Sequence, residues 1–393
     1  MPLPISVSLP RSKSIVIRCL IVNYIKNGTL LPIKENDPND IKIVFNALQT
    51  IDIQKKSRIG EWRVIDVEDC GAAYRFLMAL LAVTHGKWLL TGTPRVLERP
   101  ILPLLNFLNN NGANIQKVQQ GWLIEGCKLQ IENYDIDTSE TSQFLSAVMM
   151  IEGTKERESL DFQFSIFNFQ FSPYIRMTET ILNYSDAQMC SVVTLSDWSA
   201  AIFWLANALL IPETHYLLEK LYFDGLQGDA QIVPWFVKNG LSLNENQYGI
   251  EVKHGQKSKI SKQEIDVTHT PDLAMLLATL AVCYPFELTL SGLQNLNLKE
   301  SRRLDIMVSE LSKFTTLIKY SNNKITICKR INPLPQSFHF DSYNDHRFVM
   351  TWALFKNFGN VKISHADCVR KSYPEFLVYP LEIYPVLQKS LQI

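Results

Sequence analysis

The sequence lacks an excess of charge of either sign. Its 39 Lys and Arg residues balance 39 Asp and Glu residues, so the formal net charge is zero. Proteins that bind nucleic acids usually carry a basic excess, and we therefore expect no nucleic-acid partner. A locally basic site is still possible. With 46% hydrophobic and 20% charged residues, the composition is that of a globular chain that can bury a core.

Clustered cysteines and long apolar runs are also missing. The seven cysteines are scattered, with no Cys-x-x-Cys pair and no Cys/His cluster, which favours reduced thiols over a disulfide framework or a zinc site. No apolar run reaches the roughly 18 residues of a membrane span. Residues Met1 to Pro4 do not start the basic-then-apolar pattern of a signal peptide. We expect a cytoplasmic protein with no membrane partner.

Common cofactor and metal motifs are absent too. The sequence contains no Gly-x-Gly-x-x-Gly and no phosphate-binding P-loop. His346 has no neighbouring His or Cys at the spacing of a metal site. We therefore expect a protein that works without a cofactor and without a metal.

Six segments share one design, a polar cluster followed by an apolar run. Ser, Thr, Asp and Asn are good helix N-caps, and the apolar spacing that follows predicts buried helices. Successive starts are 56 to 74 residues apart, which is too long for a single helical repeat but fits an α/β unit used six times. The six helices are expected to begin near Ser12, Asp69, Thr141, Asp197, Thr270 and Asn344.

Strand-like runs lie between these helices. They alternate apolar and polar residues or are rich in β-branched residues, and Gly or Asn residues bound them. The clearest runs are 87–92, 121–125, 286–290 and 323–327, and second helices are expected over 101–109 and 304–314. A length of 393 residues suits two domains. No low-complexity linker separates them, and the repeat spacing places the crossover near residues 193–196.

Polar and basic residues gather at the predicted helix starts. Lys13 and Ser14, with Arg18 one turn on, open the first helix, where the backbone already favours an anion. Arg99 precedes Pro100 at another helix start and offers a bidentate fork. Hydroxyl and amide groups at 141–143 can hold phosphate oxygens. Each segment alone also fits an ordinary solvated helix start.

The second half of the chain adds carboxylates to this pattern. Asp272 follows Pro271 in a first helical turn, and Glu300 lies among three cations in 299–303. A carboxylate in such surroundings can act as an acid or a base, with a pKa set by burial and by its neighbours. Residues 343–347 again place an arginine, Arg347, at a helix start, and Lys371 lies in a loop near the C-terminus. The recurrence at corresponding points predicts a shared anionic ligand.

These motifs together resemble the 5-enolpyruvylshikimate-3-phosphate synthases, the carboxyvinyltransferases of the shikimate pathway. The resemblance covers nearly the whole chain and is most specific in TGTPRVLERPI and YNDHRFVM. The other motifs, in order, are LPRSKSIVIR, DCGAAYRFL, TSQFLSAVMM, SPYIRMT, QGDAQI, THTPDLAM, NLNLKESRRLD and RKSYPEF. The resemblance implies an α/β fold of two domains, each made of three βαβαββ units (an inside-out α/β barrel). One domain comprises 1–11 plus 195–393, the other comprises 12–194, and the active site lies in the cleft between them.

The resemblance also implies the reaction. The family moves the enolpyruvyl group of phosphoenolpyruvate to the 5-hydroxyl of shikimate 3-phosphate and releases phosphate, as a step of chorismate and aromatic amino acid biosynthesis. It implies Asp272, Glu300 and Lys13 as the catalytic residues and a monomer as the active form. Phosphoenolpyruvate is expected at Lys13, Gly71, Arg99, Gln143, Arg303, Arg347 and Lys371. Shikimate 3-phosphate is expected at Ser14, Arg18, Thr141, Ser142, Gln143, Tyr174, Asp272, Asn295 and Lys299.

Several positions depart from the family's usual motifs. Arg11 replaces a glycine and is expected to add bulk and charge beside the cleft, and Ala72 replaces a threonine and loses a hydroxyl. Arg302 replaces an aspartate and reverses its charge, and the serine before Pro-Tyr is displaced to Ser172. The carboxylates, lysines and arginines named above are all retained. We therefore expect an active enzyme with a possible change in inhibitor sensitivity.

Two alternative functions remain open from the sequence. The related transferase that moves the same group to a UDP-sugar would be expected to carry an acid–base cysteine in the loop 93–100, and this loop has none. A catalytically impaired, anion-binding member of the fold would explain the changes at Arg11 and Ala72, but it would not explain the retained Asp272 and Glu300.

Overall fold

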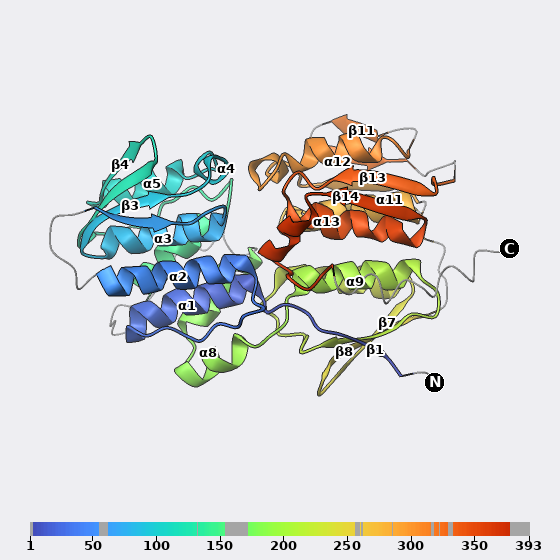
Figure 1. The fold of residues 1–393 in the computed structure, drawn as a ribbon, viewed down its shortest axis with the longest axis horizontal. Coiled ribbons are helices and arrows are strands. Elements are labelled where there is room, and N and C mark those ends of the chain that lie inside the picture. Colours follow the sequence, from blue (N-terminus) through green and yellow to red (C-terminus); the bar gives the residue numbers. More distant parts are fainter. Residues whose placement is uncertain are drawn as a thin grey trace. The chain divides into compact units, whose positions relative to one another are not determined.

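The computed structural model describes residues 3–54, 62–131, 133–153, 172–255, 260, 262–284, 286–315, 318–321, 323–328 and 333–377. The chain divides into two compact units, whose elements are labelled in Figure 1. Unit 1 comprises Met1–Ser12, Asn36–Pro38 and Thr194–Ile393, and unit 2 comprises Lys13–Glu35 and Asn39–Val193. Residues 36–38 pack with unit 1, although the sequence-based division places them in the domain 12–194, because Asp37 forms an ion pair with Arg11.

Unit 2 combines one four-stranded sheet with a set of helices. The strands β2 (Arg63–Asp66), β3 (Gly86–Thr91), β4 (Asn114–Val118) and β5 (Gly121–Gly126) have the order β2-β3-β5-β4, with only β2 and β3 parallel. The helices are α1 (Lys13–Asn27), α2 (Asn39–Gln54), α3 (Gly71–Val83), α4 (Pro94–Leu97), α5 (Leu102–Asn110), α6 (Gln143–Glu152), α7 (Pro173–Leu182) and α8 (Asp186–Val192). The predicted site residues of this unit lie on α1, α3, α6 and α7, just before α6, and in the turn between α4 and α5.

Unit 1 contains three sheets. The first has the order β1-β6-β8-β7, from β1 (Ile5–Val7), β6 (His215–Glu219), β7 (Leu241–Asn246) and β8 (Gly249–His254). The second has the order β11-β12-β10-β9, from β9 (Gln263–Asp266), β10 (Leu288–Ser291), β11 (Ile318–Ser321) and β12 (Lys324–Ile327). The third pairs β13 (Ser337–Asp341) in parallel with β14 (Asn360–Ser364).

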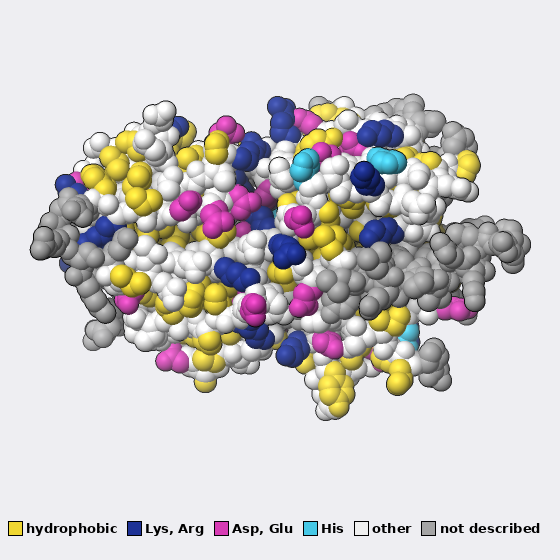
Figure 2. Space-filling model, in the orientation of Figure 1, with side chains coloured by type: hydrophobic (Ala, Val, Ile, Leu, Met, Phe, Trp, Pro, Cys, Tyr) yellow, Lys and Arg dark blue, Asp and Glu magenta, His cyan; other side chains and the backbone are white. Residues whose placement is uncertain are grey.

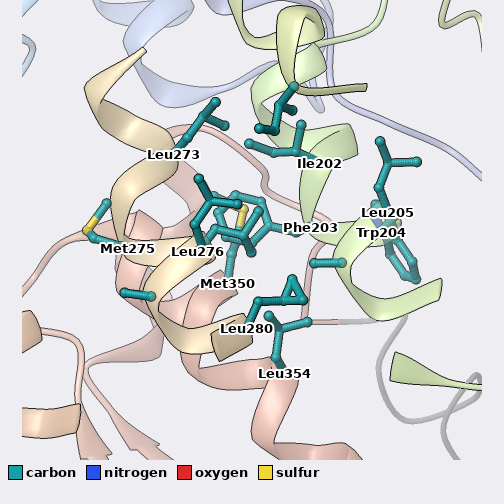
Figure 3. Packing of buried hydrophobic residues seen from close by; sticks show 14 of the residues in the cluster. Ile202, Phe203, Trp204, Leu205, Leu273, Met275, Leu276, Leu280, Met350 and Leu354 are labelled. Atoms are coloured by element: carbon teal, nitrogen blue, oxygen red, sulfur yellow. The ribbon is translucent and has the colours of Figure 1, made fainter. Parts of the chain in front are cut away.

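Three apolar helices form the core of unit 1. They are α9 (Trp198–Leu210), α11 (Ala274–Cys283) and α13 (His346–Ala353), and every residue of α11 is buried. A helix that is apolar on all sides is stable only inside a protein. Figure 3 shows Phe203 of α9, Leu276 of α11 and Met350 of α13 packed together. The remaining elements are α10 (Val233–Lys238), α12 (Arg303–Leu311), η1 (Gly228–Ile232), η2 (Pro271–Leu273), η3 (Leu296–Leu298), η4 (Leu354–Asn357) and η5 (Ala366–Lys371).

The structure confirms the predicted alternation of strands and helices. The βαβαββ order is complete in β2–β5 and β9–β12. The strands β1, β6, β7 and β8 form a separate sheet with an equivalent strand order, and α9 and α10 lie between these strands in the sequence. Among the described residues, the segment that follows β12 shows two strands, and the segments around α1–α2 and α6–α8 show helices only. The predicted three complete copies per domain are therefore not all present in the described part of the chain.

Helix starts agree with the predictions to within a few residues. Asp197 caps α9 as predicted, but Cys70 rather than Asp69 caps α3, and Asp345 rather than Asn344 caps α13. The helix near Thr270 begins as the short 3-10 helix η2 before α11. These shifts arise because the residue whose side chain reaches the free N–H groups becomes the cap, and a sequence pattern does not distinguish neighbouring polar residues.

The surface and helix lengths agree with the composition. Among the described residues, no helix has both the length and the apolar character of a membrane span. On the face shown in Figure 2, basic and acidic side chains are both scattered over the described surface. This distribution fits the formal net charge of zero.

Candidate active site

In unit 1, Arg303 forms ion pairs with carboxylates from three separate segments. Its Nη1 lies 2.7 Å from Asp272 Oδ1, its Nη2 lies 2.7 Å from Glu300 Oε2, and its Nε lies 2.7 Å from Asp345 Oδ2. The Arg303 side chain is only 1% exposed. Because a buried cation needs compensating charge, these three acids fix the position of the guanidinium and are fixed by it in turn.

The turn before α13 places Asp345 and Arg347 in this cluster. Tyr343 and Asn344 both adopt left-handed backbone conformations, with φ of 53° and 55°. Such a conformation is uncommon for residues other than glycine and turns the chain sharply at the helix start. Asp345 then caps α13 by accepting the N–H of Arg347 at 3.0 Å, and it also accepts the Ser301 hydroxyl at 2.9 Å.

Cations surround Asp272. Its Oδ2 lies 3.0 Å from Arg347 Nη2, and its Oδ1 lies 3.6 Å from Lys299 Nζ, in addition to the contact with Arg303. Burial of Asp272 opposes its ionisation, but Arg347, Lys299 and Arg303 together outweigh that effect and hold the pKa of Asp272 well below its usual range. In this structure Asp272 is therefore an ionised carboxylate.

Two further predicted residues lie on elements next to this cluster. Asn295 caps η3, and Lys299 follows the same short helix at its other end. Lys371 is the last residue of η5, which packs against α13, and its side chain is buried. The structure thus brings together Asp272, Lys299, Glu300, Arg303 and Arg347 by direct contacts, and it places Asn295 and Lys371 on adjoining elements.

In unit 2, the buried Arg18 of α1 is held by neutral groups. Its Nε donates to Thr178 Oγ1 at 2.7 Å, and its Nη1 donates to the Ser14 carbonyl at 2.9 Å. The guanidinium also lies over the rings of Phe76 and Tyr174, with centroid distances of 5.1 and 5.9 Å. Burial lowers the pKa of Arg18 to about 10, so it stays protonated at neutral pH.

A buried arginine normally has an acidic partner, but no Asp or Glu forms an ion pair with Arg18 in the described part of the chain. Arg303, the buried arginine of unit 1, differs in this respect because it forms ion pairs with three carboxylates. A permanent cation kept in a buried place without an anion indicates that a ligand supplies the negative charge.

The start of α3 forms a second part of the unit 2 site. A side chain at Gly71 would place its Cβ 2.0 Å from Arg99 Nη1, so the absence of a side chain lets the Arg99 guanidinium lie against the helix start. Arg75, one turn further along α3, donates to Gln143 Oε1 at 2.8 Å. The contact joins Gly71 and Arg99 to the start of α6, where Gln143 is the first residue.

The remaining predicted residues of unit 2 lie at the starts of α1 and α6. Lys13 opens α1 and its Nζ lies 2.9 Å from Asp40 Oδ2. Thr141 Oγ1 accepts the N–H of Gln143 at 3.3 Å, whereas the Ser142 side chain forms no capping bond. Helix starts with polar side chains favour anions, and α6 contacts both α1 and α3.

Several residues of both clusters were not predicted from the sequence. Asp345 belongs to the YNDHRFVM motif, but the sequence pattern predicted Asn344 as the helix start and gave Asp345 no role. Arg75, Ser146 and Thr178 lie inside amphipathic or apolar helices, where polar residues carry no distinctive spacing. Asp229 of the QGDAQI motif is also buried; burial raises its pKa and the charge of Arg347 partly offsets this effect.

The departures from the family motifs have different structural settings. Arg11 is buried and forms two hydrogen bonds with Asp37, one of them from Nε to Oδ1 at 2.7 Å, so its charge is compensated. Cys70 caps α3 through its sulfur. Ser172 is the N-cap residue of α7, and its side chain forms no capping hydrogen bond.

Arg302 is exposed and should tolerate substitution. Its side chain is 72% exposed and pairs with Asp305 one turn along α12, at 2.7 Å. Exposed ion pairs of this kind contribute at most about 1 kcal/mol. We expect Arg302→Asp, which restores the usual family residue, to change the free energy of unfolding by less than about 1 kcal/mol and turnover by less than about threefold. Urea unfolding and steady-state kinetics check this, and a larger loss of turnover would assign Arg302 a role in the site.

Comparison with known proteins gives a consistent result. The family model "EPSP synthase (3-phosphoshikimate 1-carboxyvinyltransferase)" matches residues 3–378. A 3-phosphoshikimate 1-carboxyvinyltransferase from Bacteroides fragilis is 28% identical over 94% of this chain and 93% of its own length. The enzyme of that name from Buchnera aphidicola is 27% identical over 98% and 96%.

Solved structures show the same fold. EPSP synthase from Acinetobacter baumannii superposes with a TM-score of 0.65 and 16% sequence identity, covering 94% of this chain and 93% of that one. The match to the family model extends over nearly the whole chain, and the motifs that carry the two clusters lie within it. The chain therefore belongs to the EPSP synthase family.

Proposed function

We propose that this protein transfers the enolpyruvyl group of phosphoenolpyruvate to the 5-hydroxyl of shikimate 3-phosphate and releases phosphate. The observation that carries the proposal is the buried, acid-free Arg18 beside the polar start of α1. A buried guanidinium without an acidic partner suits the binding of an anionic group of a small molecule, because its N–H groups can bind two oxygens of a carboxylate or phosphate. Membership of the family supplies the identity of the two anionic substrates.

The two clusters take different parts of the chemistry. The unit 2 group holds shikimate 3-phosphate: Ser14, Arg18, Thr141, Ser142, Gln143 and Tyr174. Asp272, Asn295 and Lys299 complete that set from unit 1. Phosphoenolpyruvate is bound by Lys13, Gly71, Arg99, Gln143, Arg303, Arg347 and Lys371. Preorganised cations of this kind stabilise charge that develops in a transition state without reorganising.

The proposed reaction is an addition followed by an elimination. A proton moves to the methylene carbon of phosphoenolpyruvate, from Glu300 with the help of Lys13, and the 5-hydroxyl oxygen bonds to the adjacent carbon while Asp272 accepts the hydroxyl proton. The tetrahedral intermediate then loses phosphate as its C–O bond to that group breaks, and Glu300, now a carboxylate, takes a proton from the methyl carbon so that the double bond is regenerated. Positioning of both substrates supplies much of the rate enhancement.

The ion pairs in the structure suggest how Asp272 becomes a base. With three cations around it, Asp272 holds a proton only weakly. When an anionic substrate binds Arg303 and Arg347, it shares their positive charge, and the pKa of Asp272 rises towards a value useful for catalysis. Substrate binding therefore prepares the carboxylate for the proton that it receives.

The alternative functions have less support. Transfer to a UDP-sugar would be expected to use a cysteine in residues 93–100, and the loop contains none. An impaired, anion-binding member would explain Arg11 and Ala72, but Arg11 is paired with Asp37, and the acids and bases of unit 1 are in mutual contact. We also propose that the protein acts as a monomer in the cytoplasm; its seven free cysteines fit a reducing compartment.

The test is phosphate release from phosphoenolpyruvate by the purified protein, with and without shikimate 3-phosphate. We expect release only when both substrates are present. We also expect shikimate 3-phosphate at about 100 times its Kd to stabilise the fold by about 2.7 kcal/mol, seen as a higher melting temperature. Arg18→Met should abolish that shift, because the ligand loses its buried cation.

Three outcomes separate the alternatives. Release that requires shikimate 3-phosphate supports the transferase. A thermal shift without any phosphate release would instead support an anion-binding protein. Phosphate release that requires a UDP-sugar would assign the other transferase. Analytical ultracentrifugation of the same sample tests whether the protein is a monomer.

A further inference from the structure

Within the described part of the chain, neutral groups make all the polar contacts of Arg18, which is unusual for a buried arginine. Besides Thr178 Oγ1 at 2.7 Å and the Ser14 carbonyl at 2.9 Å, its Nη2 donates to Ser146 Oγ at 3.4 Å. Thr178 on α7 and Ser146 on α6 are both completely buried, and their hydroxyls lie 3.0 Å apart. Two hydroxyls from two helices thus meet at one guanidinium.

Counting the N–H groups of Arg18 shows what this arrangement leaves available. A guanidinium has five N–H donors and no acceptor, so each hydroxyl can only accept from it. The three contacts use the Nε–H and one N–H on each of Nη1 and Nη2. One N–H on each terminal nitrogen remains, and two such donors can bind the two oxygens of one carboxylate or phosphate group.

We propose that Thr178 and Ser146 are positioning residues that orient the Arg18 fork towards an anionic group of the substrate without neutralising its charge. A carboxylate side chain in either place would orient the guanidinium equally well, but it would form an ion pair and compete with the ligand. Hydroxyls supply the geometry and leave the full positive charge of Arg18 for a carboxylate or phosphate of the ligand. The proposal rests on the proposed function, since it concerns how shikimate 3-phosphate is recognised.

The Thr178 hydroxyl also forms a hydrogen bond within its own helix, so another threonine with the same kind of bond can serve as a control. Its hydroxyl can donate to the Tyr174 carbonyl one turn back at 2.9 Å, and this leaves a lone pair for Arg18. Thr180, two residues along the same helix, forms the same kind of bond to the Arg176 carbonyl at 2.9 Å, but it is only partly buried and is not among the hydrogen-bond partners of Arg18. Thr180→Val is therefore a matched control for Thr178→Val.

The first test is steady-state kinetics with both substrates. We expect Thr178→Val to raise KM for shikimate 3-phosphate about tenfold to a hundredfold, the effect of one lost hydrogen bond to a charged group. KM for phosphoenolpyruvate should change by less than about twofold, because Arg18 is not assigned to that substrate. Ser146→Ala should have a smaller effect, since its bond is longer. Thr178→Ser, which keeps the hydroxyl, should restore KM to within about threefold.

The second test reads the position of Arg18 without turnover. In the ¹H–¹⁵N NMR spectrum of the protein, the Arg18 Nε–H should exchange slowly with water in the wild type and in Thr180→Val. In Thr178→Val it should exchange at least about tenfold faster, because its acceptor is gone. If wild-type protein releases no phosphate, the proposed function fails, and the exchange measurement with added inorganic phosphate still decides the role of Thr178.

The proposal is overturned by either of two results. Thr178→Val could leave both KM and the exchange rate unchanged in a protein that melts normally. Alternatively, Thr178→Val could raise both KM values together with a fall in melting temperature that Thr178→Ser also shows, which would mean that Thr178 only supports helix packing. Rescue by serine combined with a selective change in KM is the outcome that supports the positioning role.

Discussion

Arg303→Met is expected to lower the free energy of unfolding by about 3–5 kcal/mol and to abolish detectable phosphate release. Arg303 is buried and lies 2.7 Å from each of Asp272, Glu300 and Asp345. Removing the cation leaves carboxylates from three segments facing one another with less compensating charge. Such an unbalanced buried cluster is among the most destabilising changes that a single substitution makes.

The same substitution should change how stability depends on pH. In the wild type the pKa of Asp272 is lowered, so its contribution to stability is fully present above the pKa of the unfolded chain. That contribution is lost only as the pH falls through the folded-state pKa, far into the acid range. Without Arg303 the folded-state pKa rises, and acid unfolding should begin at a higher pH. Urea titrations across pH 3 to 8 measure this, as an order-of-magnitude comparison of the two proteins.

Arg302→Met serves as the control for Arg303→Met. The two arginines are adjacent in sequence, but Arg302 is 72% exposed and Arg303 is 1% exposed. The control should unfold like the wild type at every pH. If Arg303→Met were as stable as Arg302→Met and still turned over, the ion cluster would have no role in either stability or catalysis.

Asp272→Asn is expected to reduce turnover by about a thousandfold or more while the protein still folds. Asparagine has nearly the shape of aspartate but cannot accept the proton that the 5-hydroxyl loses. The fold should survive because Arg303 keeps its contacts with Glu300 and Asp345. The loss should appear in kcat, since the proton transfer belongs to the reaction step rather than to binding.

Two further measurements test this assignment: the binding of phosphoenolpyruvate to Asp272→Asn, and the turnover of a control in which an exposed acid is substituted. Asp272→Asn removes a negative charge from beside Arg347 and Lys299, so phosphoenolpyruvate should bind at least as tightly as in the wild type. Asp305→Asn changes an exposed acid of α12 that pairs with Arg302, and it should leave kcat within about twofold. A normal kcat in Asp272→Asn would remove Asp272 from the acid–base chemistry.

The sequence by itself determined the positions of the elements and the chemical character of the ligand. Polar residues followed by apolar runs predicted α1, α3, α6, α9, α11 and α13, because capping and burial are local properties of the chain. The motifs also predicted Lys13, Arg18, Arg99, Arg303 and Arg347 as anion-binding residues, and Asp272 and Glu300 as an acid–base pair. The family comparison agrees with that reading at the level of the whole chain.

The tertiary structure decided which of these charges compensate one another. Arg303 meets Asp345 across 42 residues of sequence, and Arg18 meets Thr178 across 160. Such pairings depend on how helices pack, and a spacing pattern along one helix carries no information about a partner on another. The sequence could therefore list the cations, but only the packing separates Arg303, which contacts three acids, from Arg18, which contacts no acid among the described residues. This difference leaves Arg18 for a ligand.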